Sequence, residues 1–539
     1  MILLWGSNAR EAHPIFFHHV LKAVHAGARL HVIDPRRTTS AQWADTWLGL
    51  NVGSDVALAN AMGREIIHAG LCNRAFIEHA TTGFEAYAAG VERYTLEHAE
   101  KVTGVPADAI REVAHAYARA DRAELCWTLG ITEHHNAVDN VLALINLALL
   151  CGHVGRYGSG LNPLRGQNNV QGGGDMGAIP NRLPGFQDLE NDEEACARFE
   201  RAWGTPINRK YGWHMTEMLA AIDRGELTAL YVLGENPVQS DADAHHVRHL
   251  LASLDHLVVQ DIFLTATAEM ADVVLPAAAS WCESEGTVTN SERRVQRVRA
   301  ALRPPGQARD DLEIMYDLAR RLGHDWRYDS SEAVWNELRS LAPNHAGMSY
   351  ARLEELGGIP WPCFHEDRLE PSYLHGWLWE DPLPRPPVPF TVVEDEPPVD
   401  ELSEDFPLLL TTGRRLDSFN TGVQTGGYIS PLRRAEELEL SIADAEKLGL
   451  EDGQRVRITS RRGSVTAPVR VQPSLRRGLA FMTLHFPEEV ETNLLTINAT
   501  DPKSGTAEFK ATAIRVEPVA GDGLGDRAAA VEPVAMAGD

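Results

Sequence analysis

The chain has 539 residues, of which 44% are hydrophobic and 23% are charged, an ordinary composition for a globular protein with room for three or more domains. The formal net charge of −26 argues against binding nucleic acid through a general basic surface. No apolar run reaches eighteen residues, so the sequence predicts no transmembrane helix, and the first residues lack the pattern of a signal peptide.

The six cysteines are not arranged as Cys-x-x-Cys pairs. Their spacing suits neither a disulfide scaffold nor a zinc or iron–sulfur site. We therefore expect reduced, mostly structural thiols in a cytoplasmic protein, and we predict no metal ligand from this chain.

The N-terminal region predicts a βαβ unit. Residues 2–5 form an apolar run that ends at Gly6, which indicates a buried parallel strand. A helix is expected over residues 15–26 and a second strand over residues 30–33. Ligands bind at the carboxyl ends of such strands, where this sequence places polar side chains, namely Asn8, Asp34 and Arg36. The Gly-x-Gly-x-x-Gly motif of NAD enzymes is missing, which makes an NAD site a weak interpretation.

Further elements extend this first α/β domain. Helices are expected over residues 57–69, 105–118 and 137–150, and a buried strand over residues 125–129. Asn136, with Asp139 three residues later, is placed like a capping box before the last helix. His134 and His135 precede that helix at the carboxyl end of a strand. This position favours proton handling or cofactor contact for His134, although a simple pair of loop histidines is the alternative.

Residues 164–177 form the most unusual stretch, Leu-Arg-Gly-Gln-Asn-Asn-Val-Gln-Gly-Gly-Gly-Asp-Met-Gly. It is too polar for a core strand and too rich in glycine for a helix interior. Glycines let a backbone approach a ligand closely, side-chain amides can hydrogen-bond a heterocycle, and the planar fork of Arg165 fits a carboxylate or phosphate. We interpret the stretch as a ligand-binding loop; the alternative is a surface loop with turn residues.

The second half predicts another α/β region and then a barrel. Strands are expected over residues 229–233, 257–259 and 273–276, with polar residues after the first two, so a second nucleotide-binding half is plausible. Residues 380–406 are rich in proline and acid and indicate a linker or an extended crossing. Short strands then predict a β-barrel, and the small, polar residues 520–539 are expected to be disordered. The barrel strands are expected over residues 408–413, 455–459, 465–469 and 479–483.

The stretch around Arg165 also resembles a family. Arg-Gly-Gln-Asn-Asn-Val-Gln-Gly followed by Asp-Met-Gly is similar to the active-site loop in the large catalytic subunit of molybdenum- or tungsten-dependent formate dehydrogenases, which are molybdopterin oxidoreductases. The resemblance covers nearly the whole chain, although Glu11 stands where an aspartate is common. Its other segments are residues 6–8, 13–14, 34–36, 53–55, 234–240, 260–263, 271–276, 286–296, 412–415, 420–421, 485–487, 493–496 and 509–510.

The resemblance implies a fold of two Rossmann-like doubly wound α/β domains and a C-terminal barrel of the double-psi type. The expected division is 1–167 and 168–379 for the α/β domains, 380–406 for the linker, 407–519 for the barrel and 520–539 for the tail. It also implies two molybdopterin guanine dinucleotides, molybdenum or tungsten, and formate as the substrate, with Arg165 holding the carboxylate. The implied cofactor contacts are Asn8, Asp34, Arg36, Gly53, Asp55, Gln167, Gly234, Asn236, Ser240, Gln260, Asp261, Gly413, Arg414, Asn420, Asn493 and Lys510.

One part of the family pattern is missing. Family members carry, upstream, a cysteine-rich domain for a [4Fe–4S] cluster and a Cys-His or selenocysteine-His pair that binds the metal; this sequence has neither. A buried strand also rarely starts at an initiator methionine. We therefore expect a formate dehydrogenase chain whose N-terminal part is truncated or encoded separately, and an iron–sulfur or electron-transfer partner. The alternatives are a non-catalytic pterin-binding protein and another oxidoreductase such as a nitrate reductase; the loop sequence favours formate over nitrate.

Overall fold

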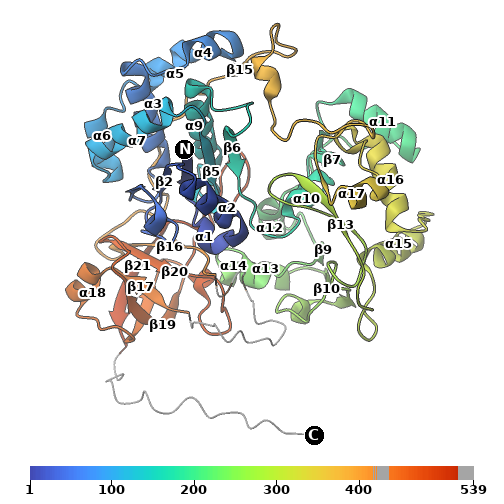
Figure 1. Ribbon diagram of the computed structural model, residues 1–539. Coiled ribbons are helices and arrows are strands. Elements are labelled where there is room, and N and C mark those ends of the chain that lie inside the picture. The colour runs from blue at the N-terminus through green and yellow to red at the C-terminus, as the bar shows by residue number, and fades with distance from the viewer. Residues whose placement is uncertain (417, 419–420, 422–435, 520–539) are drawn as a thin grey trace.

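The computed structural model describes residues 1–416, 418, 421 and 436–519. Asn420 and the tail that is predicted to be disordered lie outside these residues. Figure 1 shows the first α/β domain in blue, the barrel in orange and red below it, and the second α/β region in green and yellow on the other side of the molecule. The predicted fold class, α/β with parallel sheets and a closed barrel, is confirmed.

The first domain is built on a five-stranded parallel sheet in the order β3-β2-β1-β5-β6. The order reverses between β1 and β5, which is the switch point where sheets of this kind leave a crevice at the carboxyl ends of their strands. Apolar side chains from strands and helices form two cores: Trp5, Tyr87 and Tyr117 help to fill one, and Leu4 and Phe17 belong to the other. The strands are β1 (Ile2–Trp5), β2 (Leu30–Ile33), β3 (Thr46–Leu48), β5 (Glu124–Trp127) and β6 (Gly160–Pro163), and the helices are α1 (Ala9–Ala12), α2 (Pro14–His25), α3 (Asp55–His68), α4 (Arg74–Ala80), α5 (Phe84–Val91), α6 (Leu96–Thr103), α7 (Ala107–Arg119), α8 (Leu129–Thr132) and α9 (Ala137–Cys151).

The predicted capping box before α9 is wrong. The Oδ1 atom of Asn136 accepts a hydrogen bond from Nδ2 of Asn140 at 3.2 Å, and Asp139 pairs with Lys503 of the barrel. A tertiary partner more than 300 residues away has replaced the local contact that the spacing suggests. The strand predicted over residues 125–129 ends earlier, at Trp127, because the short helix α8 begins at Leu129.

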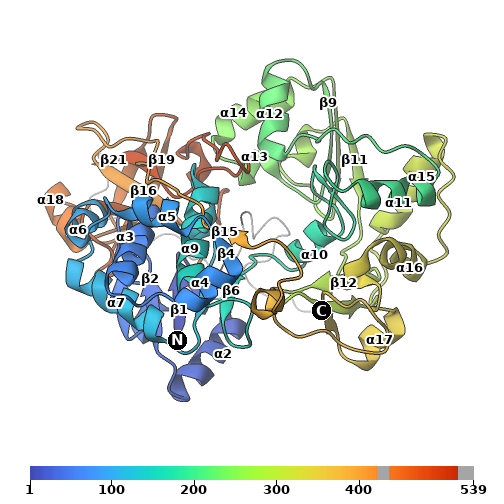
Figure 2. The same cartoon turned by 90° about the horizontal axis from the view of Figure 1, so that it is seen from above.

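The second region contains two small sheets. A parallel sheet has the order β11-β10-β9, and an antiparallel sheet has the order β12-β13-β14. Figure 2 shows this region apart from α3, α6 and α7, with α10 lying towards the first domain. Its strands are β7 (Arg182–Leu183), β8 (Gln187–Asp188), β9 (Ala229–Leu233), β10 (His256–Asp261), β11 (Val273–Pro276), β12 (Gly286–Thr289), β13 (Arg294–Val298) and β14 (Ile359–Pro360), and its helices are α10 (Val170–Asp175), α11 (Glu193–Trp203), α12 (Met215–Asp223), α13 (Pro237–Ser240), α14 (Ala244–Ala252), α15 (Asp311–Arg321), α16 (Ser331–Leu341) and α17 (Tyr350–Glu355).

Helix α10 contradicts the expectation that the glycine-rich stretch contains no helix. Tertiary contacts stabilise it where intrinsic propensity does not. The buried carboxylate of Asp175 accepts hydrogen bonds from Nε1 of Trp361 at 2.8 Å and from Nε2 of Gln171 at 2.9 Å. Asn169 precedes the helix with a φ of +64°, and its Oδ1 accepts from the backbone N–H of Thr289 at 2.9 Å. The second region therefore holds the loop in a defined shape.

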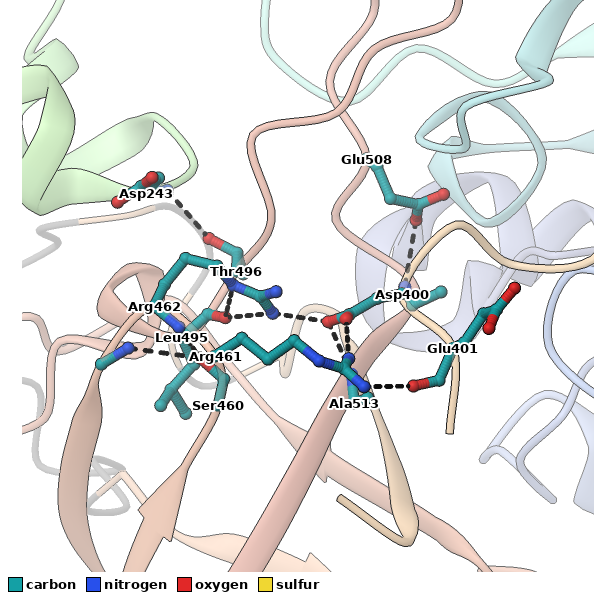
Figure 3. Close-up of polar contacts among 12 residues, drawn as sticks. Asp243, Asp400, Glu401, Ser460, Arg461, Arg462, Leu495, Thr496, Glu508 and Ala513 are labelled. Carbon is teal, nitrogen blue, oxygen red and sulfur yellow. Dashed lines mark hydrogen bonds and ion pairs between the residues drawn. The ribbon is translucent and has the colours of Figure 1, made fainter. Parts of the chain in front are cut away.

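Residues 380–406 cross the molecule in extended form. Strand β15 (Val388–Pro389) pairs with β4 (Thr81–Thr82), and Phe390 and Val393 belong to the core of the first domain. Asp400, in the later part of the crossing, is buried in an ion-pair cluster with Arg461 and Arg462 (Figure 3). Arg462 in turn donates to the carbonyl of Leu495 at 3.0 Å. This cluster, the Asp400 cluster, ties the crossing to the barrel.

The barrel is closed, with the strand order β16-β20-β17-β19-β18-β21. Two of its neighbouring pairs, β16 with β20 and β17 with β19, are parallel. Strands β17 and β21 were not predicted from the sequence. Within the described part of the chain, no helix is long and apolar enough to cross a membrane. The barrel elements are β16 (Leu408–Thr412), β17 (Leu438–Leu440), α18 (Ile442–Leu448), β18 (Arg455–Thr459), β19 (Ser464–Val471), β20 (Leu479–Met482) and β21 (Thr512–Pro518).

Candidate functional site: two cavities that share a wall

Two cavities open at the carboxyl ends of the two parallel sheets. The first cavity, of about 120 Å³, lies above β1, β2 and β5, and the second, of about 930 Å³, lies beyond β9 and β10. The two share one wall, which consists of Leu129 and four barrel residues, Thr412, Gly413, Arg414 and Lys510. The first cavity brings together the predicted residues Asn8, Asp34, Arg36, Gly53, Asp55 and His134, and the second brings together Gln167, Gly234, Asn236, Ser240, Gln260 and Asp261.

Two glycines allow the backbones at the switch point to approach each other. Gly6 follows β1 with a φ of +57°, and a Cβ atom there would lie 2.8 Å from the carbonyl carbon of Gly130. A Cβ atom on Gly130 would lie 2.5 Å from the carbonyl oxygen of Gly6. Both glycines line the first cavity. A side chain at either position would force the two loops apart and change the floor of the cavity.

The variant Gly6→Ala should therefore lose more stability than backbone strain alone explains. A left-handed non-glycine residue costs roughly 1–2 kcal/mol, and the clash should add roughly 1–3 kcal/mol. The matched control is Gly204→Ala, because Gly204 also has a positive φ, +67°, but within the described structure no atom lies within 4 Å of its added Cβ. Urea unfolding of both variants provides the measurement. Equal losses in the two variants would show that the contact with Gly130 does not matter.

Several polar atoms of the first cavity are buried and have no hydrogen-bond partner among the described residues: Asn8 Nδ2, Arg36 Nε and His13 Nδ1. Oδ1 of Asn8 is already engaged, because it accepts from Oγ of Ser40 at 2.9 Å. The guanidinium of Arg36 lies over the ring of Phe481, 3.3 Å from its centroid. Unpartnered buried polar atoms are costly, so these atoms are suited to bonding a ligand.

Two buried carboxyl groups face the same cavity. Burial raises the pKa of Asp34 to about 6, although a hydrogen bond from the Arg36 backbone and the charges of Arg36 and Lys510 oppose this shift. Burial also raises the pKa of Asp55, which His134 and a 2.7 Å hydrogen bond from Nε1 of Trp5 counteract. Ionisation of Asp34 is therefore less favourable in the ligand-free protein than for an exposed carboxyl group. Once ionised, the carboxylate can accept hydrogen bonds from a ligand.

The variant Asp34→Asn should stabilise the ligand-free protein and weaken its hold on a ligand. The folded-state pKa of Asp34 lies above its ordinary value of 3.8, so the folded chain binds the proton more tightly than the unfolded chain. Stability is then lost as the pH rises from about 4 to about 6. At pH 7 we expect the variant to be more stable by roughly 1–3 kcal/mol. Urea unfolding of the variant and the wild type from pH 4 to pH 8 tests this. A difference in the free energy of unfolding that does not shrink towards pH 4 would contradict the prediction.

His134 is held by a carboxylate that sequence analysis missed. Its Nδ1 lies 3.3 Å from Oε2 of the fully buried Glu508. Burial lowers the pKa of His134, but the charge and hydrogen bond of Glu508 outweigh burial and raise it overall. The pKa of Glu508 is depressed in turn, because His134 and His135 outweigh the effect of its burial. The pair therefore favours the protonated form of the imidazole on the wall of the first cavity.

The shared wall carries two cations. Nζ of Lys510 lies 2.6 Å from Oε2 of Glu133 and 3.2 Å from the carbonyl oxygen of Thr412. Arg414 donates from Nη1 to the carbonyl of Gly166 at 3.2 Å, and burial lowers the pKa of its guanidinium. A wall with two cations between two cavities is suited to phosphate groups on either side.

In the second cavity two of the predicted side chains, those of Asn236 and Ser240, shape the loop after β9. Oδ1 of Asn236 accepts from Oγ1 of Thr267 at 2.7 Å, and Oγ of Ser240 donates to Glu235 at 2.6 Å. Gly234 has a φ of +64°, and no atom of the described chain lies within 4 Å of its position for a Cβ. This glycine leaves the cavity open where a side chain would fill it.

Of the predicted residues that the structure describes, Arg165 and Asn493 lie outside the lining of both cavities. Nδ2 of Asn493 donates to the carbonyl oxygens of Gln239 and Ser240 at 2.9 and 3.1 Å, so it holds the loop after β9 from the barrel side. The side chain of Arg165 is exposed, but Leu164 and Gly166 line the first cavity and Gln167 lines the second. The loop therefore runs between the two cavities.

Three functional candidates were missed by sequence analysis: Glu133, Phe481 and Glu508. Each contacts a predicted residue that is remote in the sequence, namely Lys510, Arg36 and His134. Carboxylates and phenylalanines are too common for their position in the sequence alone to reveal such contacts. Only the packing of the barrel against the first domain brings the two residues of each pair together.

Residues 1–321, more than half of the chain, match the protein-family model "Molybdopterin oxidoreductase", and residues 408–513 match the model "Molydopterin dinucleotide binding domain". The chain belongs to the molybdopterin oxidoreductase family. Its homologues within the family include formate dehydrogenase alpha subunits. The barrel matches the dinucleotide-binding domain of the family, and its loop 412–414 forms part of the wall between the two cavities.

The chain is 41% identical over 526 residues to the "F420-dependent formate dehydrogenase 2 subunit alpha" of Methanococcus maripaludis, a match that covers 96% of this chain and 76% of that protein. It is 36% identical over 526 residues to "Formate dehydrogenase H" of Escherichia coli, covering 96% and 73% of the two chains. Among solved structures, acetylene hydratase from Pelobacter acetylenicus matches with a TM-score of 0.73 at 20% identity, over 96% of this chain and 78% of that one. This last likeness shows the fold alone.

The polar groups that line the first cavity have the chemistry that a dinucleotide requires. Asn8 and Arg36 present unpartnered donors, His13 presents an unpartnered ring nitrogen, and Asp34 and Asp55 present acceptors. These groups match the mixed donors and acceptors of a nucleoside, and the shared wall supplies cations for phosphates.

Proposed function

We propose that this chain is the catalytic chain of a formate dehydrogenase and holds two molybdopterin guanine dinucleotides, one in each cavity, with molybdenum or tungsten. The observation that carries the proposal is the pair of cavities that meet at Thr412, Gly413, Arg414 and Lys510. The pterin-bound metal supplies the redox chemistry, the acceptance of two electrons from formate, that no side chain can perform. The homology to formate dehydrogenase alpha subunits supports formate as the substrate.

The residues of this chain bind the dinucleotides and orient the formate. In the first cavity, Asn8 and Arg36 donate to the dinucleotide and Asp34 accepts from its sugar or base. Lys510 and Arg414 offset the charge of phosphates on both sides of the shared wall. Arg165 holds the formate carboxylate through its planar fork. Gln167 and the residues after β9 and β10 line the site of the second dinucleotide.

We further propose that an iron–sulfur partner supplies the protein ligand of the metal and the exit for electrons. Among the described residues, no group of three histidine, cysteine, aspartate or glutamate side chains is placed to hold a metal ion. The six cysteines are free thiols, which supports a reducing, cytoplasmic setting.

The test is to produce the chain in a host that makes the pterin cofactor, alone and together with the genes that flank its own. Pterin and metal content are measured first, and then formate-dependent dye reduction and nitrate-dependent oxidation of reduced dye. Two dinucleotides per chain with formate-dependent activity would support the proposal. Activity with nitrate and none with formate would replace it by a nitrate reductase. Bound cofactor with neither activity in any preparation would leave a non-catalytic binding protein.

A further inference from the structure

His13 lies between the first cavity and the loop that carries Arg165. It stands between α1 and α2, and its Nε2 is 2.6 Å from the carbonyl oxygen of Arg165. Because a carbonyl oxygen can only accept, Nε2 must carry the proton in this contact. The imidazole thus donates to the backbone of the residue that we propose as the formate clamp.

The tautomer of His13 follows from this contact. Burial lowers the pKa of the ring; the hydrogen bond to Arg165 raises it in part, and the charge of Arg414 lowers it again. The ring is therefore neutral at neutral pH and carries a single N–H. With the proton on Nε2, Nδ1 can only accept. Nδ1 is buried and has no hydrogen-bond partner in the described protein, and His13 lines the first cavity.

We propose that His13 is a positioning residue that couples the dinucleotide in the first cavity to the formate clamp. Its Nδ1 accepts a hydrogen bond from an N–H or O–H group of the dinucleotide, while its Nε2–H holds the carbonyl of Arg165. The inference rests on the proposed function and adds to it a link between the two sites.

The surroundings of the loop explain why one hydrogen bond has a large effect on the position of Arg165. The Arg165 side chain is exposed, so its place depends on its backbone. That backbone has two side-chain anchors: the carbonyl bonds His13, and the N–H donates to Oγ of Ser291 at 3.1 Å. Pro14 follows His13 and restricts its backbone, which leaves ring rotation as the main freedom of His13. A bound dinucleotide that donates to Nδ1 fixes this rotation and, through it, the clamp.

Two variants separate the two roles. A glutamine amide reaches the position of Nε2, so His13→Gln can still donate to the Arg165 carbonyl but has no acceptor near Nδ1. An asparagine carbonyl reaches the position of Nδ1, so His13→Asn keeps the acceptor and loses the bond to Arg165. The controls are His18→Gln and His18→Asn on the exposed face of α2. All are compared in the holoenzyme, by dinucleotide content after gel filtration and by kcat and KM for formate per bound dinucleotide.

We expect His13→Gln to lose at least half of its dinucleotide with KM for formate within twofold of the wild type. We expect His13→Asn to keep its dinucleotide with KM raised about tenfold and kcat little changed. Any other pattern, such as the same two defects in both variants or no defect in either, would overturn the coupling. A wild-type holoenzyme without formate activity would refute the proposed function instead, while dinucleotide content would still compare the two variants.

A measurement on the wild type does not depend on how the variants fold. Amide hydrogen exchange of residues 164–170 is followed by mass spectrometry in the cofactor-loaded and the cofactor-free protein. Slower exchange in the loaded protein is expected, because the fixed imidazole holds the Arg165 carbonyl. Equal exchange in the two forms would overturn the proposal.

Discussion

Replacing Arg165 by glutamine should lower kcat/KM for formate by about 10- to 150-fold. A charge-assisted hydrogen bond to a carboxylate contributes roughly 1.5–3 kcal/mol, which corresponds to that range. Arg165→Lys should recover part of the loss, since lysine keeps the charge but not the planar fork. Dinucleotide content should stay at the wild-type level, because the Arg165 side chain lies outside the lining of both cavities among the described residues.

The matched control for this prediction is Arg201→Gln, since Arg201 is an exposed arginine on α11. Steady-state kinetics with formate as the varied substrate, at equal dinucleotide content, measures the effect. A wild-type value of kcat/KM in Arg165→Gln would remove Arg165 from the substrate site. A matching loss in Arg201→Gln would point to a general effect of surface charge rather than a clamp.

The variant Asp400→Asn should lower the free energy of unfolding by about 3–5 kcal/mol. The side chain of Asp400 is 2% exposed; it pairs with Arg461, accepts from Nη2 of Arg462 at 2.5 Å and accepts from the backbone N–H of Ala513 at 2.9 Å. Removing one partner of a buried ion pair leaves the remaining charge uncompensated, which is strongly destabilising. The same substitution at the exposed Asp405 is the control, with an expected change within about 0.5 kcal/mol.

A double-mutant cycle with Arg462→Met tests whether the loss comes from this pair. In the double variant the arginine that would be left without its counter-charge has also been removed. The double variant should therefore lose less stability than the sum of the losses of the two single variants. Amide exchange of the peptide that contains Ala513 gives a local measurement and should become faster in Asp400→Asn. Strict additivity, together with unchanged exchange there, would show that the cluster in Figure 3 does not stabilise the barrel.

The arrangement of the candidate site could largely be predicted from the sequence. Asn8, Asp34 and Gly234 follow apolar strands, and parallel strands place their carboxyl ends on one edge of a sheet. Local order in the chain therefore determines that Asn8 and Asp34 gather at the edge of the first sheet, and that Gly234 lies at the edge of the second parallel sheet. The structure gives positive φ angles to Gly6 and Gly234, the glycines that follow two of these strands, and such angles favour the residue without a Cβ.

The contacts between distant segments could not be predicted in this way. Asp139 pairs with Lys503 instead of capping α9, and the glycine-rich loop contains α10 because Trp361 holds Asp175. Each outcome depends on a partner that local propensity does not include.

By itself, the sequence of this protein determined the two parallel sheets, the barrel and the polar edge of each sheet, since all of these follow from hydrophobic period and strand direction. Only the tertiary structure decided that the barrel closes both cavities with one wall and that Glu508 pairs with His134. The reason is that strand periodicity is a local property of the chain. The partner of a buried charge is chosen by how separate domains pack, which no short stretch of sequence encodes.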